Sequence, residues 1–206
     1  MLSKESVKRK DKFSRIYFIL AGIVLIIIAL AIPASTFVPV FKAEINYQLN
    51  KKNTEPVEVV PINPEFSIVI PKINANAKVV ENVDPFDSKI YQRALTQGVA
   101  HAKGTSTPNK SGNTFIFAHS AGNWYQANQF NAVFYLLNKL EAGDEIIVYY
   151  QSQKYIYSVN EIKFVKSDEI NYLSNNFKDN KLTLMTCWPP GTTLKRLVVI
   201  STLKND

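Results

Sequence analysis

The chain has 206 residues but few that could perform nucleophilic chemistry: one cysteine, two histidines and four arginines. Cys187, the single thiol, ends the run TLMTC and is followed by Trp-Pro-Pro-Gly. A β-rich run that meets turn-forming residues predicts a strand end, with the thiol at a rim. One cysteine excludes an intrachain disulfide. The ordinary alternative for Cys187 is a buried, inert side chain.

A nucleophilic cysteine needs a proton partner and a group that stabilises negative charge. His119 ends the alternating run NTFIFAH, so we expect it at a strand end, on the same side as two phenylalanines. His101 lies in the loop-like stretch GVAHAKGT, and Arg196 begins the hydrophobic run RLVVIST. If the last two strands are neighbours, Arg196 reaches the thiol. The alternative to a catalytic role is a hydrogen-bonded structural histidine for His119 and His101, and a surface ion pair for Arg196.

Short β-rich runs separated by turn residues fill the chain from Phe66 onward and predict a mainly β domain over residues 66–206. The runs expected as strands are Phe66–Ile70, Ala77–Val80, Asn113–His119, Glu145–Tyr150, Tyr155–Lys166, Leu182–Cys187 and Leu197–Leu203. The fourth and fifth should form a hairpin. A closed barrel is preferred, and a sandwich is the alternative.

Two helices are expected within this domain. Ser88–Thr96 should be capped by Ser88 and end before Gly98. Ala127–Leu140 places four large hydrophobic residues at spacings of four and three, which predicts one buried helical face. Both helices would be insertions among the strands.

The amino-terminal third has a different composition. Residues 1–15 carry six basic and two acidic side chains, and residues 16–32 contain no charge. This pattern predicts a basic cytoplasmic head and a transmembrane anchor that places the rest outside. A cleaved signal peptide is the main alternative, because Ala-Leu-Ala at residues 29–31 resembles a cleavage site. Residues 33–65 hold five of the ten prolines and predict a semi-stiff stalk.

The net charge of +7 could suggest a nucleic-acid partner, but its distribution argues otherwise. A net +4 lies in residues 1–15, so the other 191 residues carry only +3. The excess of positive charge in residues 1–15 therefore indicates the orientation of the chain across a membrane, and we expect no nucleic-acid partner.

The ordered set of a histidine strand, TLMTC and an arginine that opens the last strand resembles the sortases, membrane-anchored cysteine transpeptidases of Gram-positive envelopes. NTFIFAHS resembles the strand that ends in the family's histidine, and residues 183–187 fit its TLxTC signature. The stretch GVAHAKGT, with Pro108 and Gly112 ahead of the histidine strand, is also similar. The resemblance extends from about Phe66 to the carboxyl end.

The resemblance implies a closed eight-stranded β-barrel in which Cys187 is the nucleophile, His119 the acid/base and Arg196 the oxyanion-stabilising or substrate-positioning group. It implies cleavage of an LPxTG-like sorting signal and transfer of the acyl group to an amine of a cell-wall peptide or a pilin lysine. No metal or cofactor is implied. The long stretch after His119, residues 121–130, departs from many members.

The resemblance also implies where the peptide binds. Residues 167–180 match the loop that recognises the sorting signal, and residues 188–195 match the loop that flanks the groove. The candidate substrate-binding residues are Leu184, Thr186, Trp188, Ser120 and His101, the last at a non-catalytic position near the site. Simple barrel packing is the alternative for Trp188.

Two other functions stay open: a non-catalytic, membrane-anchored envelope binding module, and a cysteine peptidase that hydrolyses its substrate. The complete cysteine, histidine and arginine set argues against a binding module. The sequence does not separate hydrolysis from transfer, because that depends on which nucleophile reaches the acyl-enzyme. Glu81, Asp84 and Asp87 form a loose acidic cluster that favours a solvated turn over a calcium site.

Overall fold

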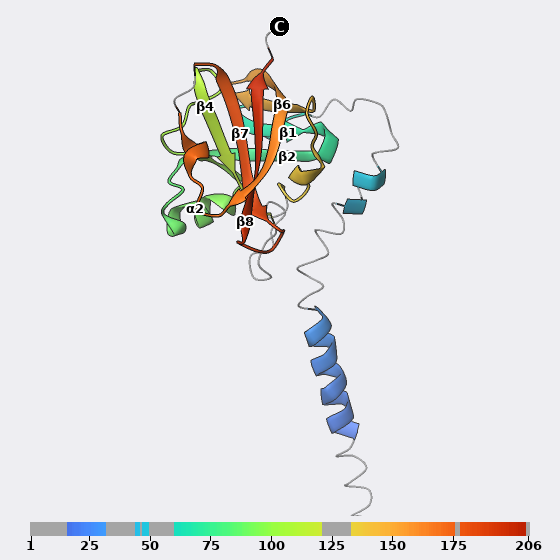
Figure 1. Cartoon of the computed structure of the whole chain (residues 1–206). Helices are drawn as coiled ribbons and strands as arrows, with labels where there is room; N and C mark the ends of the chain where they lie inside the picture. Colours follow the sequence, from blue (N-terminus) through green and yellow to red (C-terminus); the bar gives the residue numbers. More distant parts are fainter. Residues whose placement is uncertain are drawn as a thin grey trace, which may run out of the picture.

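The computed structural model describes residues 16–31, 44–45, 47–49, 60–120, 133–175 and 178–204. Its main feature is a closed barrel of eight strands in the order β1-β2-β3-β4-β7-β8-β6-β5 (Figure 1). The strands are β1 (Phe66–Ile70), β2 (Ala75–Val83), β3 (Val99–Ala102), β4 (Gly112–Phe117), β5 (Glu145–Tyr150), β6 (Gln153–Lys166), β7 (Asn180–Trp188) and β8 (Lys195–Leu203). The predicted barrel is therefore confirmed.

Two of the eight strand pairings in the barrel are parallel. One of them places β4 next to β7, although the two strands are far apart in the sequence. β2 pairs in parallel with β3, and β4 pairs in parallel with β7, whereas β7 and β8 are antiparallel. β4, β7 and β8 consequently lie side by side (Figure 1). Closure leaves none of these strands with an unpaired edge.

The β5–β6 hairpin was predicted, but its turn residues are unusual. Gln151 and Ser152 both have positive φ angles, 51° and 63°, which places two non-glycine residues in the left-handed region. Their N–H groups donate to the carbonyl oxygens of Glu65 and Pro64, at 2.9 and 3.0 Å. These bonds hold the turn and attach residues 64–65, the end of the predicted stalk, to the barrel.

The sequence expectations for the stretch around His101 and for the cap of α2 differ from the structure. The stretch around His101 is not a loop but the short strand β3, which four small or buried residues form between β2 and β4. The helix α2 (Ser88–Leu95) exists, but its cap is Asp87, whose carboxylate accepts from the N–H groups of Lys89 and Ile90. Ser88 is instead the first helical residue, because a cap side chain must precede the first turn.

The helix expected over Ala127–Leu140 is not present in its described part. Residues 133–136 form turns and η4 (Leu137–Lys139) is a single 3-10 turn, while residues 127–132 lie outside the described residues. Phe134, Leu137 and Leu140 are nonetheless buried in the core. Hydrophobic spacing predicted burial correctly here, but a 3-10 turn satisfies the same contacts as a helix would.

The amino-terminal part contains a helix over residues 16–31 whose hydrophobic side chains are largely exposed. No helix in the described ranges is long and apolar enough to cross a membrane. The transmembrane span predicted over residues 16–32 is therefore not found among them, and residues 1–15 and 32 lie outside them.

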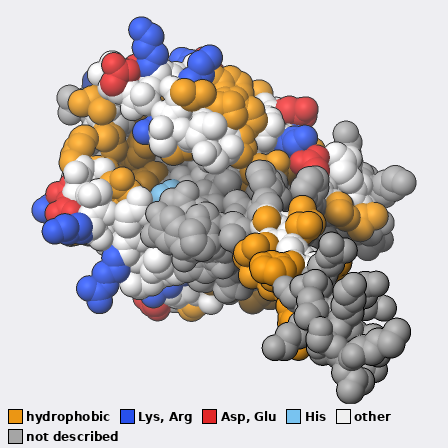
Figure 2. Space-filling view, turned by 90° about the horizontal axis from the view of Figure 1, so that it is seen from below, with side chains coloured by type: hydrophobic (Ala, Val, Ile, Leu, Met, Phe, Trp, Pro, Cys, Tyr) orange, Lys and Arg blue, Asp and Glu red, His pale blue; other side chains and the backbone are white. Residues whose placement is uncertain are grey.

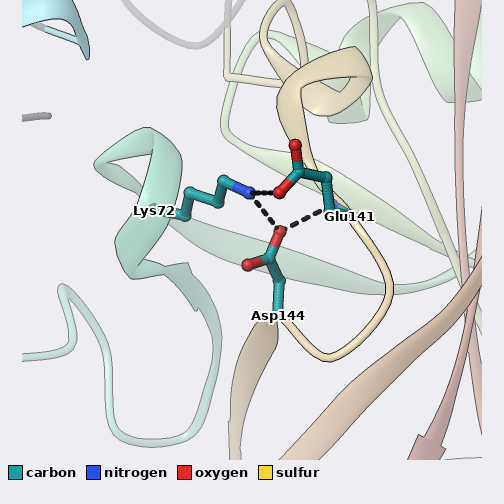
Figure 3. Close-up of polar contacts among 3 residues, drawn as sticks. All are labelled: Lys72, Glu141 and Asp144. Carbon is teal, nitrogen blue, oxygen red and sulfur yellow. Dashed lines mark hydrogen bonds and ion pairs between the residues drawn. The ribbon is translucent and has the colours of Figure 1, made fainter.

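A polar cluster joins the β1–β2 connection to the turn before β5. Lys72, on η1 (Pro71–Ile73), donates to Glu141 and Asp144, both at 2.9 Å, and the Glu141 N–H donates to Asp144 (Figure 3). Burial alone would lower the pKa of Lys72, but the two carboxylates outweigh it and raise that pKa. Lys72 is thus held in its charged form beside the turn that starts β5.

Candidate active site

Cys187 and Arg196 lie on adjacent strands. They are direct partners in the antiparallel pairing of β7 and β8, one residue from the carboxyl end of β7. Directly opposed residues point to the same face of a sheet, with Cβ atoms about 5 Å apart. The structure therefore places Cys187 and Arg196 directly opposite each other on neighbouring strands, as the sequence predicted.

His119 reaches the same place from β4. The parallel register pairs Phe117 with Met185, and two hydrogen bonds continue the pairing beyond the strand end. The N–H of Ala118 donates to the Met185 carbonyl at 3.2 Å, and the Thr186 hydroxyl donates to the Ala118 carbonyl at 2.9 Å. If this register is extended by two residues, it leads to His119 on one segment and Cys187 on the other. Strand alternation would then direct the His119 side chain to the face that carries Cys187 and Arg196.

His119 is half-buried, and a side chain of α2 contacts its ring. Its Nε2 atom lies 3.1 Å from Oε1 of Gln92. Burial lowers the pKa of His119, because the positive form loses hydration. The imidazole is therefore mostly neutral at pH 7, which suits a group that accepts and later returns a proton.

Arg196 has contacts that hold it at the start of β8. Its Nη1 atom donates to the carbonyl oxygens of Thr193 and Lys195, at 3.3 and 3.2 Å. A guanidinium has five N–H donors, so these two bonds at one nitrogen leave donor capacity for a ligand. The side chain is half-buried and belongs to the residue directly opposite Cys187, and a guanidinium there is suited to stabilise developing negative charge.

The connection between β6 and β7 borders this end of the barrel. The segment between β6 and β7 starts beside Lys195, the partner of Lys166, and ends at Asn180, the partner of Gly112 at the opposite end of β4. It must therefore run along the barrel. Asn175 secures it by accepting from Ser106 and from the N–H of Asn113.

Trp188 and Phe164 form an aromatic pair next to Cys187. Their ring centroids are 5.2 Å apart and the rings are tilted by 54°. Phe164 is 52% exposed, whereas Trp188 is partly buried and packs against the hydrophobic core. Figure 2 shows hydrophobic side chains gathered around a hollow on the face seen from below, with lysine and arginine side chains at the outer margin.

The other predicted substrate-binding residues are more enclosed. Leu184 is fully buried in the core, and Thr186 and Ser120 are buried at 2% and 3% exposure. Thr186 has a structural role, because its hydroxyl donates a hydrogen bond to the carbonyl of Ala118, the residue before His119. Substrate binding by these residues stays a prediction.

His101 is buried and hydrogen-bonded at both ring nitrogens. Nδ1 accepts from the Asn82 N–H at 3.4 Å, and Nε2 lies 3.0 Å from both the Ser106 carbonyl and the Thr105 hydroxyl. Burial lowers its pKa, although the Ser106 carbonyl and the charge of Glu81 act in the other direction. This environment is that of a neutral histidine that joins β2, β3 and the following loop.

The acidic cluster has local partners. Asp84 accepts from the Phe86 N–H, Asp87 caps α2, and Glu81 accepts from the Tyr150 hydroxyl. Within the described ranges, no group of three or more histidine, cysteine, aspartate or glutamate side chains could hold a metal ion.

Sequence reasoning missed Gln92, the residue that contacts His119. The helix was expected, but its sequence does not indicate which side faces the end of β4. Tyr91 shows that side, because its ring packs edge-on against Phe117 with centroids 6.4 Å apart. The contacts of α2 with the end of β4, which join residues more than 25 positions apart, identify Gln92, and the sequence alone does not indicate them.

Comparison with known proteins agrees with this architecture. The family model described as "Sortase domain" matches residues 68–204. Sortase D of Bacillus subtilis (strain 168) is 27% identical over 133 residues, 63% of this chain and 59% of that protein. Sortase A of Listeria monocytogenes is 35% identical over 66 residues, 32% of this chain and 29% of that protein. The chain thus spans less than two thirds of either relative.

Solved structures give the same result. Sortase C-1 from Actinomyces oris has a TM-score of 0.58 at 28% identity, covering 82% of this chain and 86% of that one. Clostridium perfringens sortase C with the C-terminal cell wall sorting motif has a TM-score of 0.58 at 25% identity, with coverages of 82% and 89%. This chain belongs to the sortase family, whose members are transpeptidases.

Proposed function

We propose that this protein is a cysteine transpeptidase that cleaves an LPxTG-like sorting signal and transfers the acyl part to an amine. The observation that carries the proposal is the direct pairing of Cys187 with Arg196, next to the end of β4 from which His119 extends. A nucleophile, a cation and a titratable group on one rim are the parts that acyl transfer requires.

In the first half-reaction neutral His119 takes the proton of the Cys187 thiol, and the resulting thiolate attacks the carbonyl carbon of the Thr–Gly bond. The carbonyl oxygen becomes an oxyanion, which the Arg196 guanidinium stabilises. Protonated His119 gives its proton to the departing glycine nitrogen as the C–N bond breaks. The products are a thioester on Cys187, a free amine and neutral His119.

In the second half-reaction an incoming amine attacks the thioester carbonyl. Neutral His119 accepts the proton that this amine loses, and the C–S bond breaks to restore the thiolate. A new amide bond replaces the one that was cleaved. Water in place of the amine would give a free acid, which is the hydrolytic alternative.

The substrate class rests on family membership. The sortase C of Clostridium perfringens was solved with a C-terminal cell wall sorting motif. We propose a cell-wall peptide or a pilin lysine as the amine donor.

The direct test is a peptide-library screen with the barrel domain, with and without triglycine, and with Cys187→Ala as the control. A new peptide–triglycine product that needs Cys187 supports transpeptidation. Free acid as the product at every triglycine concentration would support a peptidase. No Cys187-dependent cleavage of any peptide would favour a binding module.

We further propose that the domain works outside the cytoplasm, at the cell membrane. The basic residues 1–15 and the exposed hydrophobic side chains of residues 16–31 support this localisation. Protease treatment of intact cells is the test. Degradation of the barrel domain in intact cells supports the proposal, whereas protection until lysis contradicts it.

A further inference from the structure

Gln92 stands out because it connects a helix to the one histidine at the rim. α2 packs against β2 and β3, and its residues Ala94 and Leu95 are buried. Two consecutive residues of the helix then contact the end of β4: Tyr91 packs on Phe117, and Gln92 reaches His119. The helix is thereby positioned at two points relative to His119.

The hydrogen bond selects one form of the imidazole. The Gln92 atom is a carbonyl oxygen and can only accept, so Nε2 of His119 must carry the hydrogen. In a neutral imidazole the other nitrogen, Nδ1, is then the acceptor. Nδ1 is therefore the atom that can take a proton from the thiol or from an amine.

We propose that Gln92 is a positioning residue that keeps His119 in the Nε2–H tautomer and fixes its ring orientation, so that Nδ1 performs the proton transfers. This inference rests on the proposed transpeptidase function. Its central element, the tautomer, is nevertheless a property of the resting protein.

The proposal explains how a half-buried histidine keeps a defined role when its contact among the described residues is an amide oxygen. The amide oxygen accepts from Nε2–H in both the neutral and the protonated ring, so the bond persists through the cycle. A carboxylate in this position would favour the charged ring much more strongly. A neutral acceptor fixes orientation and leaves the low pKa of His119, which burial causes, largely in place.

The test compares Gln92→Leu and Gln92→Glu with Gln97→Leu, which changes an exposed glutamine just after the same helix. Nitrogen NMR of ¹⁵N-histidine-labelled protein reports the tautomer and the pKa of His119 without substrate. We expect Gln92→Leu to mix the two tautomers and lower kcat by about 10- to 100-fold with little change in KM. Gln92→Glu should retain the Nε2–H tautomer of His119 and raise the pKa of His119.

Three results would overturn the proposal: an unchanged tautomer in Gln92→Leu, an unchanged His119 pKa in Gln92→Glu, or equal effects of Gln97→Leu. Amide NMR spectra of all three variants establish that the barrel is intact. If the wild-type protein transfers no peptide, the proposed function fails, but the NMR measurement still decides the role of Gln92. A loss of kcat without any change in tautomer would assign Gln92 a packing role instead.

Discussion

Cys187 and Arg196 are directly opposed residues of one antiparallel strand pair, nine positions apart in the chain and joined by a loop of six residues. The connection holds Pro189, Pro190 and Gly191, and the carbonyl of Pro189 accepts from both the N–H and the hydroxyl of Thr192. The pairing of thiol and guanidinium thus follows from the backbone register, before any side-chain contact contributes.

Arg196 should be needed for its charge and its planar donors. Arg196→Ala should lower kcat by about 100- to 1,000-fold, because the oxyanion loses its stabilising partner. Arg196→Lys should retain part of the activity, since an ammonium keeps the charge but not the forked geometry. Single-turnover assays measure both. Lys195→Ala, at the exposed neighbouring position, serves as the control, and an equal loss in that variant would contradict the prediction.

Thr186 should matter for activity as well as for stability. Thr186→Val removes the hydroxyl that holds the Ala118 carbonyl and should cost about 1–2 kcal/mol of unfolding free energy. Released from β7, the segment carrying His119 should lose its position, with about a tenfold or greater fall in kcat.

Thr183→Val is the matched control on the same strand. Thr183 is also buried, and its hydroxyl donates to the Asn113 side chain at 2.8 Å near the opposite end of β4. We expect a similar loss of stability in urea unfolding but nearly unchanged kcat. If both valine variants lose activity to the same extent, Thr186 acts only through general stability.

Acid should destabilise the fold through its two histidines. The pKa values of His101 and His119 are both lowered by burial, so below pH 6.5 the unfolded chain binds protons that the folded chain does not. Their contribution is fully present above pH 6.5 and is lost as the pH falls towards the folded pKa values. Urea unfolding at pH 7.5 and 5.0 measures the difference.

His101→Gln separates the two contributions. This variant should be less stable at pH 7.5, because the Asn82, Thr105 and Ser106 partners are disturbed, but its stability should fall less between pH 7.5 and 5.0. An unchanged pH dependence in this variant would show that His101 does not titrate in this range.

The β5–β6 turn offers a stabilising change. Ser152 has a φ of 63°, a conformation that costs a non-glycine residue about 1–2 kcal/mol. Ser152→Gly should therefore raise the unfolding free energy by about 1 kcal/mol, because the entropy of glycine offsets part of the gain. Ser152→Val should act in the opposite direction. Both should leave kcat unchanged, since β6 meets Arg196 at its other end; thermal unfolding tests the stability effects.

Local pattern was enough to predict much of this protein. β1 and β5 have the expected bounds, and the strands carrying Cys187 and Arg196 were found with small shifts at their ends. The alternation of hydrophobic and polar residues and the presence of turn-forming residues involve only a few consecutive positions, so both can be recognised in the sequence. The TLMTC run and the later arginine were visible for the same reason.

Local sequence pattern did not predict the secondary structure correctly where contacts with distant parts of the chain determine it. β3 is only four residues long and was expected as a loop, because its strand state depends on β2 and β4 on either side. Residues 133–140 bury Phe134 and Leu137 in turns and a 3-10 helix instead of an α-helix. In both cases long-range contacts outweighed intrinsic preference.

The types of residue available for catalysis, and the order in which they occur, are properties of the chain alone, because composition and short motifs carry them. The tertiary structure decided that the end of β4, from which His119 extends, pairs with β7, and that Gln92 contacts the ring of His119. Both facts depend on the parallel pairing of β4 with β7 and on the packing of α2 against the barrel, which join segments about 25 to 70 residues apart. Such contacts form only when the barrel closes, since no local preference links such distant segments.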